Sequence, residues 1–416
     1  MKLDAGAAKT RANVALDWLS FFLADVKGTL GPYLGIYLLT VQRWDQAMIG
    51  LLMTICAMVG LIVKAPLGAF VDAARFKRAL IVTGVTCMGM AALLVPLISS
   101  FSGMLALRLT MGIAAGLFPP AVTAISLGVV GYTALAGRMA RNGAFDHAGN
   151  VCIALAAAFV GSWWSQQAIF YLAPVFAVIC VAVVLRIPSC QIDHRLARGL
   201  EKTGATEKEP VSFPTLLAYR PLLILALCAA CFHFANAPML HLVGQRLALA
   251  HPGQEALMMS ACIIGAQAVM LPMALWAGKC ADRWGRKTVF LVAFAALPMR
   301  GLLYTVSDDR WWLLTVQLLD GVGAGIFGVI APLIIADLTR GSGRFNVSLG
   351  LVATVQGVGA ALSNVVAGML VVKFGYDVAF LCLSGVAVSA LVLFGLAMPE
   401  TRGLKAGEGF LRFARA

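Results

Sequence analysis

The sequence predicts an all-α membrane protein with twelve transmembrane helices, arranged as two pseudo-symmetric six-helix bundles. The first observation is composition: 61% of the residues are hydrophobic, only 12% are charged, and the mean hydropathy is +0.89. Soluble domains carry about 25% charged residues. The second observation is a series of long apolar runs, each near the roughly 20 residues that cross a bilayer as a helix. The third is a charged motif that occurs twice, about half the chain apart.

The apolar runs divide into two sets of six expected helices. The first set comprises residues 14–40, 45–66, 79–98, 103–129, 143–164 and 167–187. The second set comprises residues 221–246, 256–276, 288–306, 311–337, 346–372 and 376–398. The stretch between the sets is polar, charged and proline-containing, which is typical of a linker. We therefore expect an N-terminal bundle over 1–187, a cytoplasmic linker over 188–220, and a C-terminal bundle with a short cytoplasmic tail over 221–416.

The net charge of +13 follows the expected topology and does not indicate a face that binds nucleic acid. With both termini in the cytoplasm, most Lys and Arg residues fall on the cytoplasmic side, as the positive-inside rule requires. We expect a multi-pass protein of a bacterial cytoplasmic (inner) membrane that works as a monomer. The ten cysteines lie mostly in spans or on the cytoplasmic side, where thiols stay reduced, so we expect no disulfide framework.

The charged motif lies between the second and third expected helices of each half. In the second half it reads G-x-x-x-D-R-x-G-R-K and supplies Gly278, Asp282, Arg283, Gly285, Arg286 and Lys287. We expect Gly278 to allow close helix approach. We expect Asp282 to accept hydrogen bonds from a helix N-terminus and to pair with Arg283 or Arg286. The copy in the first half lacks the first arginine and the second glycine, and it supplies Gly68, Asp72, Arg75, Lys77 and Arg78.

This pattern resembles the loop motif of the major facilitator superfamily, and the resemblance implies a gating latch that forms and breaks during alternating access. The halves also resemble each other elsewhere: Met111–Phe118 aligns with Asp320–Phe327, and Phe21–Asp25 aligns with Phe232–Asn236. Parallel repeats of this kind place a substrate path between the halves. Arg108 opens an R-x-x-x-G-x-x-x-G run similar to the family's fourth-helix motif, which implies a role in proton transfer.

Charged side chains inside a membrane are costly and therefore indicate functional sites. Asp25 falls near the middle of the first expected helix, where desolvation favours its protonated form, so it is the first candidate for proton coupling. A hydrogen-bonded packing role is the alternative. Lys27 can bind an anionic group or snorkel to the membrane surface. Asp146 and His147 can form a second proton step, since His titrates near neutrality, or can serve gating and interhelical hydrogen bonding.

In the second half, polar residues inside the expected spans are the candidates for substrate binding: His233, Asn236, Arg300, Asp320 and Gln356. Arg300 and Asp320 can equally pair with one another. Cys228, Cys231 and His233 suggest a soft-metal site, but their spacing does not converge on one helix face. We therefore expect no metal and no cofactor.

The sequence contains neither a nucleotide-binding loop nor a serine nucleophile elbow, which are the motifs of ATP-driven transport and of hydrolytic catalysis. We therefore expect a protein that is not an enzyme. The sequence indicates proton-coupled export of a small organic solute, with an anion or zwitterion favoured because cations outnumber acids among the deeper charges. The fifth expected helix lacks the G-P-x-x-G-G-like run of the family's drug antiporters. Proton-symport uptake of an organic anion or siderophore is the alternative, and a non-transporting membrane sensor is the alternative of another class. The expected partners are the solute, protons and the lipid bilayer.

Overall fold

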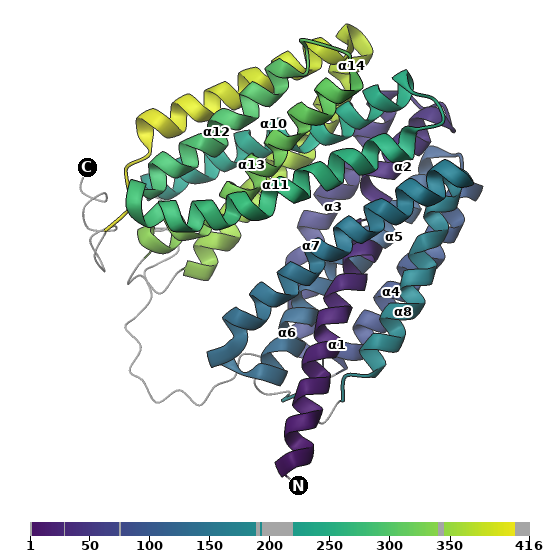
Figure 1. Cartoon of the computed structure of the whole chain (residues 1–416), viewed down its shortest axis with the longest axis vertical. Coiled ribbons are helices and arrows are strands. Elements are labelled where there is room, and N and C mark those ends of the chain that lie inside the picture. Colours follow the sequence, from purple (N-terminus) through teal and green to yellow (C-terminus); the bar gives the residue numbers. More distant parts are fainter. Residues whose placement is uncertain are drawn as a thin grey trace. The chain divides into compact units, whose positions relative to one another are not determined.

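The computed structural model describes residues 2–28, 30–74, 76–188, 192–193, 219–339 and 345–403. Nearly all of them are helical (Figure 1). The helices of the first half are α1 (Lys2–Gly28), α2 (Leu30–Thr40), α3 (Gln46–Ala73), α4 (Lys77–Leu94), α5 (Phe101–Gly116), α6 (Phe118–Val130), α7 (Tyr132–Trp163) and α8 (Leu172–Leu185), with short 3₁₀ turns η1 (Val95–Leu97) and η2 (Gln166–Tyr171). The helices of the second half are α10 (Arg220–Ala250), α11 (Glu255–Trp284), α12 (Arg286–Leu303), α13 (Arg310–Leu338) and α14 (Phe345–Ala397).

Within the described residues, nine helices are long and apolar enough to cross a membrane. Three further segments complete the twelve that the sequence predicts. One is α1 followed by α2, one is α12, and one comes from α14, which contains two helices separated by Gly375 with φ +83° and ψ 174°. The break at Gly375 lies between the expected helices 346–372 and 376–398. The expected helix 103–129 is built from α5 and α6, because Pro119 and Pro120 begin a new helix after Leu117.

Contacts between residues divide the chain into two compact units. Unit 1 contains residues 1–43, 55–204 and 248–260, and unit 2 contains residues 44–54, 205–247 and 261–416. In unit 1, α1 packs along α7 and α8, and α4 packs along α5 and α8 (Figure 1). In unit 2, α12 packs along α13 and α14. The domain boundaries expected from the sequence stay a prediction, and most of the expected linker 188–220 lies outside the described residues.

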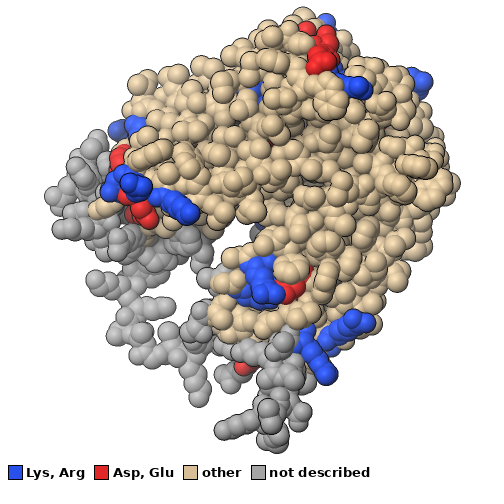
Figure 2. Space-filling model, viewed as in Figure 1, with Lys and Arg blue, Asp and Glu red and all other residues tan. Residues whose placement is uncertain are grey.

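The core of unit 2 is a cluster of aromatic rings. Phe290 and Phe294 of α12 lie 5.2 and 4.8 Å from Phe394 between ring centroids, and Phe232 of α10 lies 5.0 Å from Phe327 of α13. The outer surface is apolar as well, with Leu97, Trp163 and Leu396 more than two-thirds exposed at 76%, 75% and 84%. Charged side chains on the face shown in Figure 2 form a few small clusters. A surface of this kind fits a lipid environment.

The N-terminal part of α3 is fixed against α14 within unit 2. The Thr54 hydroxyl donates to the Ala361 carbonyl at 2.7 Å and accepts from the Val365 amide at 3.1 Å, so it lies between two backbone groups of α14. Two glycines allow this approach. A Cβ atom at Gly50 would lie 2.3 Å from the carbonyl oxygen of Asn364, and one at Gly368 would lie 2.3 Å from that of Gln46.

Replacing Gly368 with alanine should therefore destabilise the protein by about 1–3 kcal/mol, because the new methyl group would collide with backbone that cannot move aside. Gly385 on the same helix is the matched control, since a Cβ atom there has nothing within 4 Å. Gly385→Ala should be neutral or slightly stabilising. Thermal unfolding of both variants in detergent measures the difference, and equal melting temperatures would contradict the proposed close contact.

Candidate functional site

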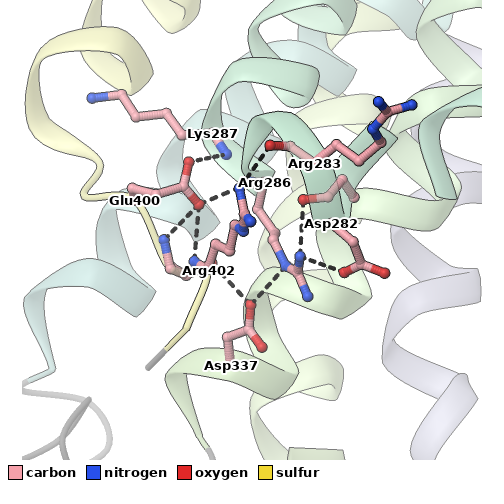
Figure 3. A network of polar contacts seen from close by, with 9 residues as sticks. Asp282, Arg283, Arg286, Lys287, Asp337, Glu400 and Arg402 are labelled. Atoms are coloured by element: carbon pink, nitrogen blue, oxygen red, sulfur yellow. Dashed lines mark hydrogen bonds and ion pairs between the residues drawn. The ribbon is translucent and has the colours of Figure 1, made fainter. Parts of the chain in front are cut away.

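Arg286 is the centre of a polar network where α11 meets α12 (Figure 3). It is the first residue of α12 and follows Gly285, whose φ of +94° turns the chain between the two helices. Its guanidinium donates to Asp282 Oδ1 at 2.7 Å, to Asp337 Oδ2 at 3.1 Å and to the Ala281 carbonyl at 2.9 Å. Of the two partners expected for Asp282, the structure shows Arg286. One cation therefore ties the end of α11 to the end of α13.

The N-terminus of α12 is capped by Glu400, from the segment that follows α14 (Figure 3). Glu400 accepts hydrogen bonds from the backbone amides of Arg286 at 2.9 Å and Lys287 at 3.1 Å. Arg402 donates to the Arg283 carbonyl at 2.7 Å. We expected a helix N-terminus to be bound by Asp282, but at α12 the acceptor is Glu400. A Cβ atom at Gly278 would lie 4.0 Å from the Val329 Cγ1 atom, which is an ordinary van der Waals contact, so the expected close approach there stays a prediction.

In the first half, Lys77 takes the place of Arg286. Each is the first residue of its helix, and each reaches back to the carbonyl that precedes the motif aspartate. The Lys77 ammonium donates to the Val71 carbonyl at 2.8 Å and to the Ala74 carbonyl at 3.0 Å, and Lys77 is only 2% exposed.

Among the other residues of the first-half motif, Arg78 donates to the Leu185 carbonyl at 3.2 Å. The side chains of Asp72 and Arg75 lie outside the described residues, and a Cβ at Gly68 would have nothing within 4 Å.

Arg300 is the most deeply buried cation described in unit 2, at 1% exposure. Its guanidinium forms an ion pair with Asp320 of α13 and lies 3.5 Å from the Asn236 carbonyl. Gln317 donates to the other Asp320 oxygen at 3.1 Å and accepts from the Tyr304 hydroxyl. The expected alternative, pairing between Arg300 and Asp320, is thus present. The Arg300 Nε atom is buried with no hydrogen-bond partner among the described residues, so the network leaves one donor unused.

His233 of α10 and Gln356 of α14 are in direct contact, with their side-chain nitrogens 2.9 Å apart. The His233 Nδ1 atom lies 3.1 Å from the Ala229 carbonyl. Since a carbonyl only accepts, Nδ1 carries the proton, and Nε2 accepts from the Gln356 amide. Both ring nitrogens are therefore occupied, which leaves His233 no free nitrogen for the soft-metal site considered above. The ring packs edge-on against Phe327, with 4.6 Å between centroids.

In unit 1, Asp146 and His147 of α7 line a cavity of about 240 Å³. α1 contributes Ser20, and α6 contributes Thr123. The Ser20 hydroxyl is buried with no partner among the described residues, and Asn150 donates to Asp146 at 3.3 Å. The cavity therefore combines a carboxylate, an imidazole and hydroxyl groups within one helical unit, which is a suitable set for holding water and protons.

A buried ion cluster that was not predicted from the sequence adjoins this cavity. Asp17 of α1, 2% exposed, pairs with Arg138 and with Arg141, which lies at 2.7 Å. Arg138 also donates to Asn142 Oδ1 at 2.9 Å, and Asn142 lines the cavity and donates to Ser126 at 3.1 Å. Two features of the sequence indicate such a cluster: an acid near the start of an apolar run, and an R-x-x-R-N sequence at residues 138–142.

Two other sequence candidates are only partly described. Asp25 and Lys27 belong to the last turn of α1, but their side chains lie outside the described residues. The backbone there is close to α7, since a Cβ at Gly149 would lie 2.2 Å from the Phe21 carbonyl oxygen.

Arg108, the remaining candidate for proton coupling, lies on α5. Its Nε atom is buried and has no hydrogen-bond partner in the described part of the chain.

Two helical units with membrane-spanning helices, a charged helix connection repeated in both halves and buried ion pairs define a two-bundle membrane transporter. The family model of the Major Facilitator Superfamily matches residues 16–274 and 222–414. The chain belongs to this family. Its known members are transporters rather than enzymes, so this chain is a multi-pass membrane transporter that moves a small molecule across a lipid bilayer.

Several relatives support this assignment. An uncharacterized MFS-type transporter of Mycobacterium tuberculosis is 46% identical over 396 residues, which is 95% of both chains. The multidrug resistance protein MdtL of Salmonella typhimurium is 33% identical over 138 residues, covering 33% of this chain and 34% of that protein. Among solved structures, a point variant of the nucleoside transporter NupG has a TM-score of 0.76 at 15% identity, covering 93% of this chain and 99% of that chain. This last similarity concerns the fold alone.

The cap at Glu400 leads to a stability prediction. Glu400→Ala should lower the free energy of unfolding by about 0.5–1 kcal/mol, because two amides of α12 lose their acceptor. Glu400→Gln keeps a side-chain oxygen that can accept a hydrogen bond and should fall between the wild type and the alanine variant. Thermal unfolding measures all three proteins. An alanine variant as stable as the wild type would show that water replaces the cap at no cost.

The pair of Arg300 and Asp320 gives a second prediction. Asp320→Asn should destabilise the protein by about 3–5 kcal/mol, because it leaves a buried cation without its counter-charge. The double variant Arg300→Met with Asp320→Leu should recover most of that loss, since it removes both charges. Thermal unfolding of the single and double variants completes the comparison. A double variant less stable than Asp320→Asn would argue against this account.

Proposed function

We propose that this transporter couples proton movement to the export of a small organic solute, with an anion or a zwitterion as its preferred cargo. It works by alternating access as a monomer in a bacterial cytoplasmic membrane, with both termini in the cytoplasm. Its N-terminal bundle, linker and C-terminal bundle are those expected over residues 1–187, 188–220 and 221–416. The observation that carries the proposal is the cavity of about 240 Å³ in unit 1, with Asp146 and His147 in its wall.

Asp146 and His147 fit proton coupling because both line this cavity and because carboxylates and imidazoles are the side chains that most often transfer protons in proteins. In this proposal they act with Asp25 and Arg108. Gly149 brings the end of α1 against α7, so the backbone of Asp25 lies near the helix that carries Asp146. Protonation of Asp25 and solute binding then compete, which gives antiport.

The preference for an anion or zwitterion rests on the cations. Arg300 has one buried donor unused, and Arg108 has another. A carboxylate on the solute supplies the acceptor that these groups lack. Lys27, His233, Asn236, Asp320 and Gln356 complete the proposed binding set. Gln356 uses one amide N–H in its contact with His233, and its second N–H and its oxygen are the groups proposed to bind a polar solute.

The two motif regions act as latches in this scheme. In the first half, the buried Lys77 holds helix ends together through two backbone carbonyls. In the second half, Arg286 does so through Asp337 and through Asp282, whose side chain is exposed. The pair of Arg286 with the exposed Asp282 can break and re-form with little net cost. The remaining motif residues Gly68, Asp72, Arg75, Arg78, Gly278, Arg283, Gly285 and Lys287 belong to the same proposed latches.

Export is favoured over uptake because the partial relatives include multidrug resistance proteins and a tetracenomycin C resistance and export protein of Streptomyces glaucescens. Everted membrane vesicles separate the two directions. Vesicles acidified inside are given candidate anions, zwitterions and lipophilic cations, and the internal pH is followed with a fluorescent amine. An exported solute should enter the vesicles in exchange for protons and raise the internal pH. A further fall in internal pH when solute is added would indicate symport uptake.

The proton residues can be tested with the solute that this screen identifies. Asp146→Asn and Asp25→Asn should each reduce the solute-dependent rise in pH at least tenfold, because neither amide carries a proton. Asp193→Asn is the control, since Asp193 lies outside the helices and outside the proposed set. If both amide variants keep the wild-type response, the proton-coupling scheme is wrong. Facilitated diffusion or the sensor alternative would then become the better account.

A further inference from the structure

A second cavity in unit 1, of about 470 Å³, lies between α1 and α8 and has no part in the proposed transport cycle. Its wall consists of Arg11, Val14, Ala15, Trp18, Val183 and Arg186. The four residues from α1 have the spacing i, i+3, i+4 and i+7, so they form one stripe along the helix. In Figure 1, α1 and α8 lie along each other, and the contacts between them agree. The cavity is therefore a groove between two packed helices.

The groove is amphipathic along its length. Arg186 directly follows the apolar span Gln166–Leu185, so it stands where the hydrocarbon layer ends. Arg11 stands at the corresponding end of the α1 stripe. Beyond the two arginines the wall is apolar, and it remains open to the surroundings: Val14 is 46% exposed and Trp18 is 45% exposed. A tryptophan next to basic residues at the end of a span is typical of the membrane interface.

The two arginines differ from the other cations near this end of unit 1. Arg138 and Arg141 share the carboxylate of Asp17. Arg11 and Arg186 have neither an ion pair nor a hydrogen bond recorded with any residue that the structure describes. Two cations at the same end of an apolar groove attract a ligand with an anionic head and a hydrocarbon tail. Of the molecules in a bacterial membrane, an anionic phospholipid has this chemistry.

We propose that the groove between α1 and α8 binds one anionic phospholipid, with its phosphate between Arg11 and Arg186 and an acyl chain along Val14, Trp18 and Val183. The bound lipid also supports the aromatic packing behind the groove. Trp18 lies 5.8 Å from Phe22 and 6.2 Å from Phe145 between ring centroids. Phe22 in turn lies 6.0 Å from Phe176 of α8, so the lipid fills the open side of a contact that joins three helices.

Native mass spectrometry of the full-length protein in detergent tests the proposal with phosphatidylglycerol, cardiolipin and phosphatidylcholine. One anionic lipid should bind with higher affinity than phosphatidylcholine. The double variant Arg11→Gln with Arg186→Gln should weaken anionic binding by about 30-fold, on the basis that each basic residue near the surface contributes about fivefold. The matched control is Arg43→Gln with Lys373→Gln, which removes two exposed basic residues elsewhere and should keep the wild-type preference.

Three results would overturn the proposal: equal affinity for phosphatidylcholine, an unchanged preference in the groove variant, or an equal loss in the control. Glycerol phosphate at millimolar concentration should not compete, because it has no acyl chain. Competition by it would identify a simple phosphate site instead of a lipid site. Binding is measured without transport, so the result is independent of the proposed proton coupling.

A second measurement does not need the arginine variants to fold. Brominated phosphatidylglycerol should quench the tryptophan fluorescence of the wild type more strongly than brominated phosphatidylcholine, because bromine atoms in the groove would lie against Trp18. In Trp18→Phe the difference between the two lipids should disappear. A difference that persists in Trp18→Phe would show that the preferred lipid binds elsewhere, which contradicts the assignment of this groove.

Discussion

A cation enclosed by apolar helices needs a partner, and the pairing of Arg300 with Asp320 is the interaction on which unit 2 depends. The pair crosses from α12 to α13, and Gln317 and Tyr304 extend it into a chain of hydrogen bonds. Separating the two charges would leave Arg300 buried and uncompensated, which is far more costly than never having placed a charge there. Any relative movement of α12 and α13 must therefore either preserve this pair or supply Arg300 with a new acceptor.

The first-half copy of the charged motif is degenerate in sequence, but it still supplies a cation at the start of the following helix. Alignment by the motif glycines puts Phe76, and not a basic residue, opposite Arg286. The first half has a longer connection, so α4 begins at Lys77 while α12 begins at Arg286. In both halves the first residue of the helix supplies the cation that satisfies the carbonyl before the motif aspartate. The two halves therefore share a cation at the first position of the helix. In the sequence alignment, this cation is shifted by one residue between the halves.

Hydropathy and local patterns could predict the spans, the interruption at Gly375 and the partnership of Asp282 with Arg286, because each depends on residues close in sequence. They could not predict Glu400 at the start of α12, which comes from 114 residues away, or the pairing of Asp17 with Arg138, 121 residues away. Those contacts depend on which face of one helix meets which face of another. An apolar sequence carries little information on that point, because nearly every face of a membrane helix is hydrophobic.

Helix α1 shows how separate features can be linked through one element. Each residue advances about 100° around a helix, so Trp18 points away from Asp17, whereas Ser20, three residues after Asp17, lies near it on the same face. Asp17 binds Arg138 of α7, Trp18 forms the wall of the groove beside α8, and Ser20 lines the cavity that contains Asp146. A rotation or shift of α1 would alter all three environments together. The ion cluster resists such a movement most strongly, since Asp17 is nearly inaccessible to water and its two arginines have no other carboxylate among the described residues. The groove beside α8, the buried ion cluster and the cavity that contains Asp146 therefore share one turn of one helix.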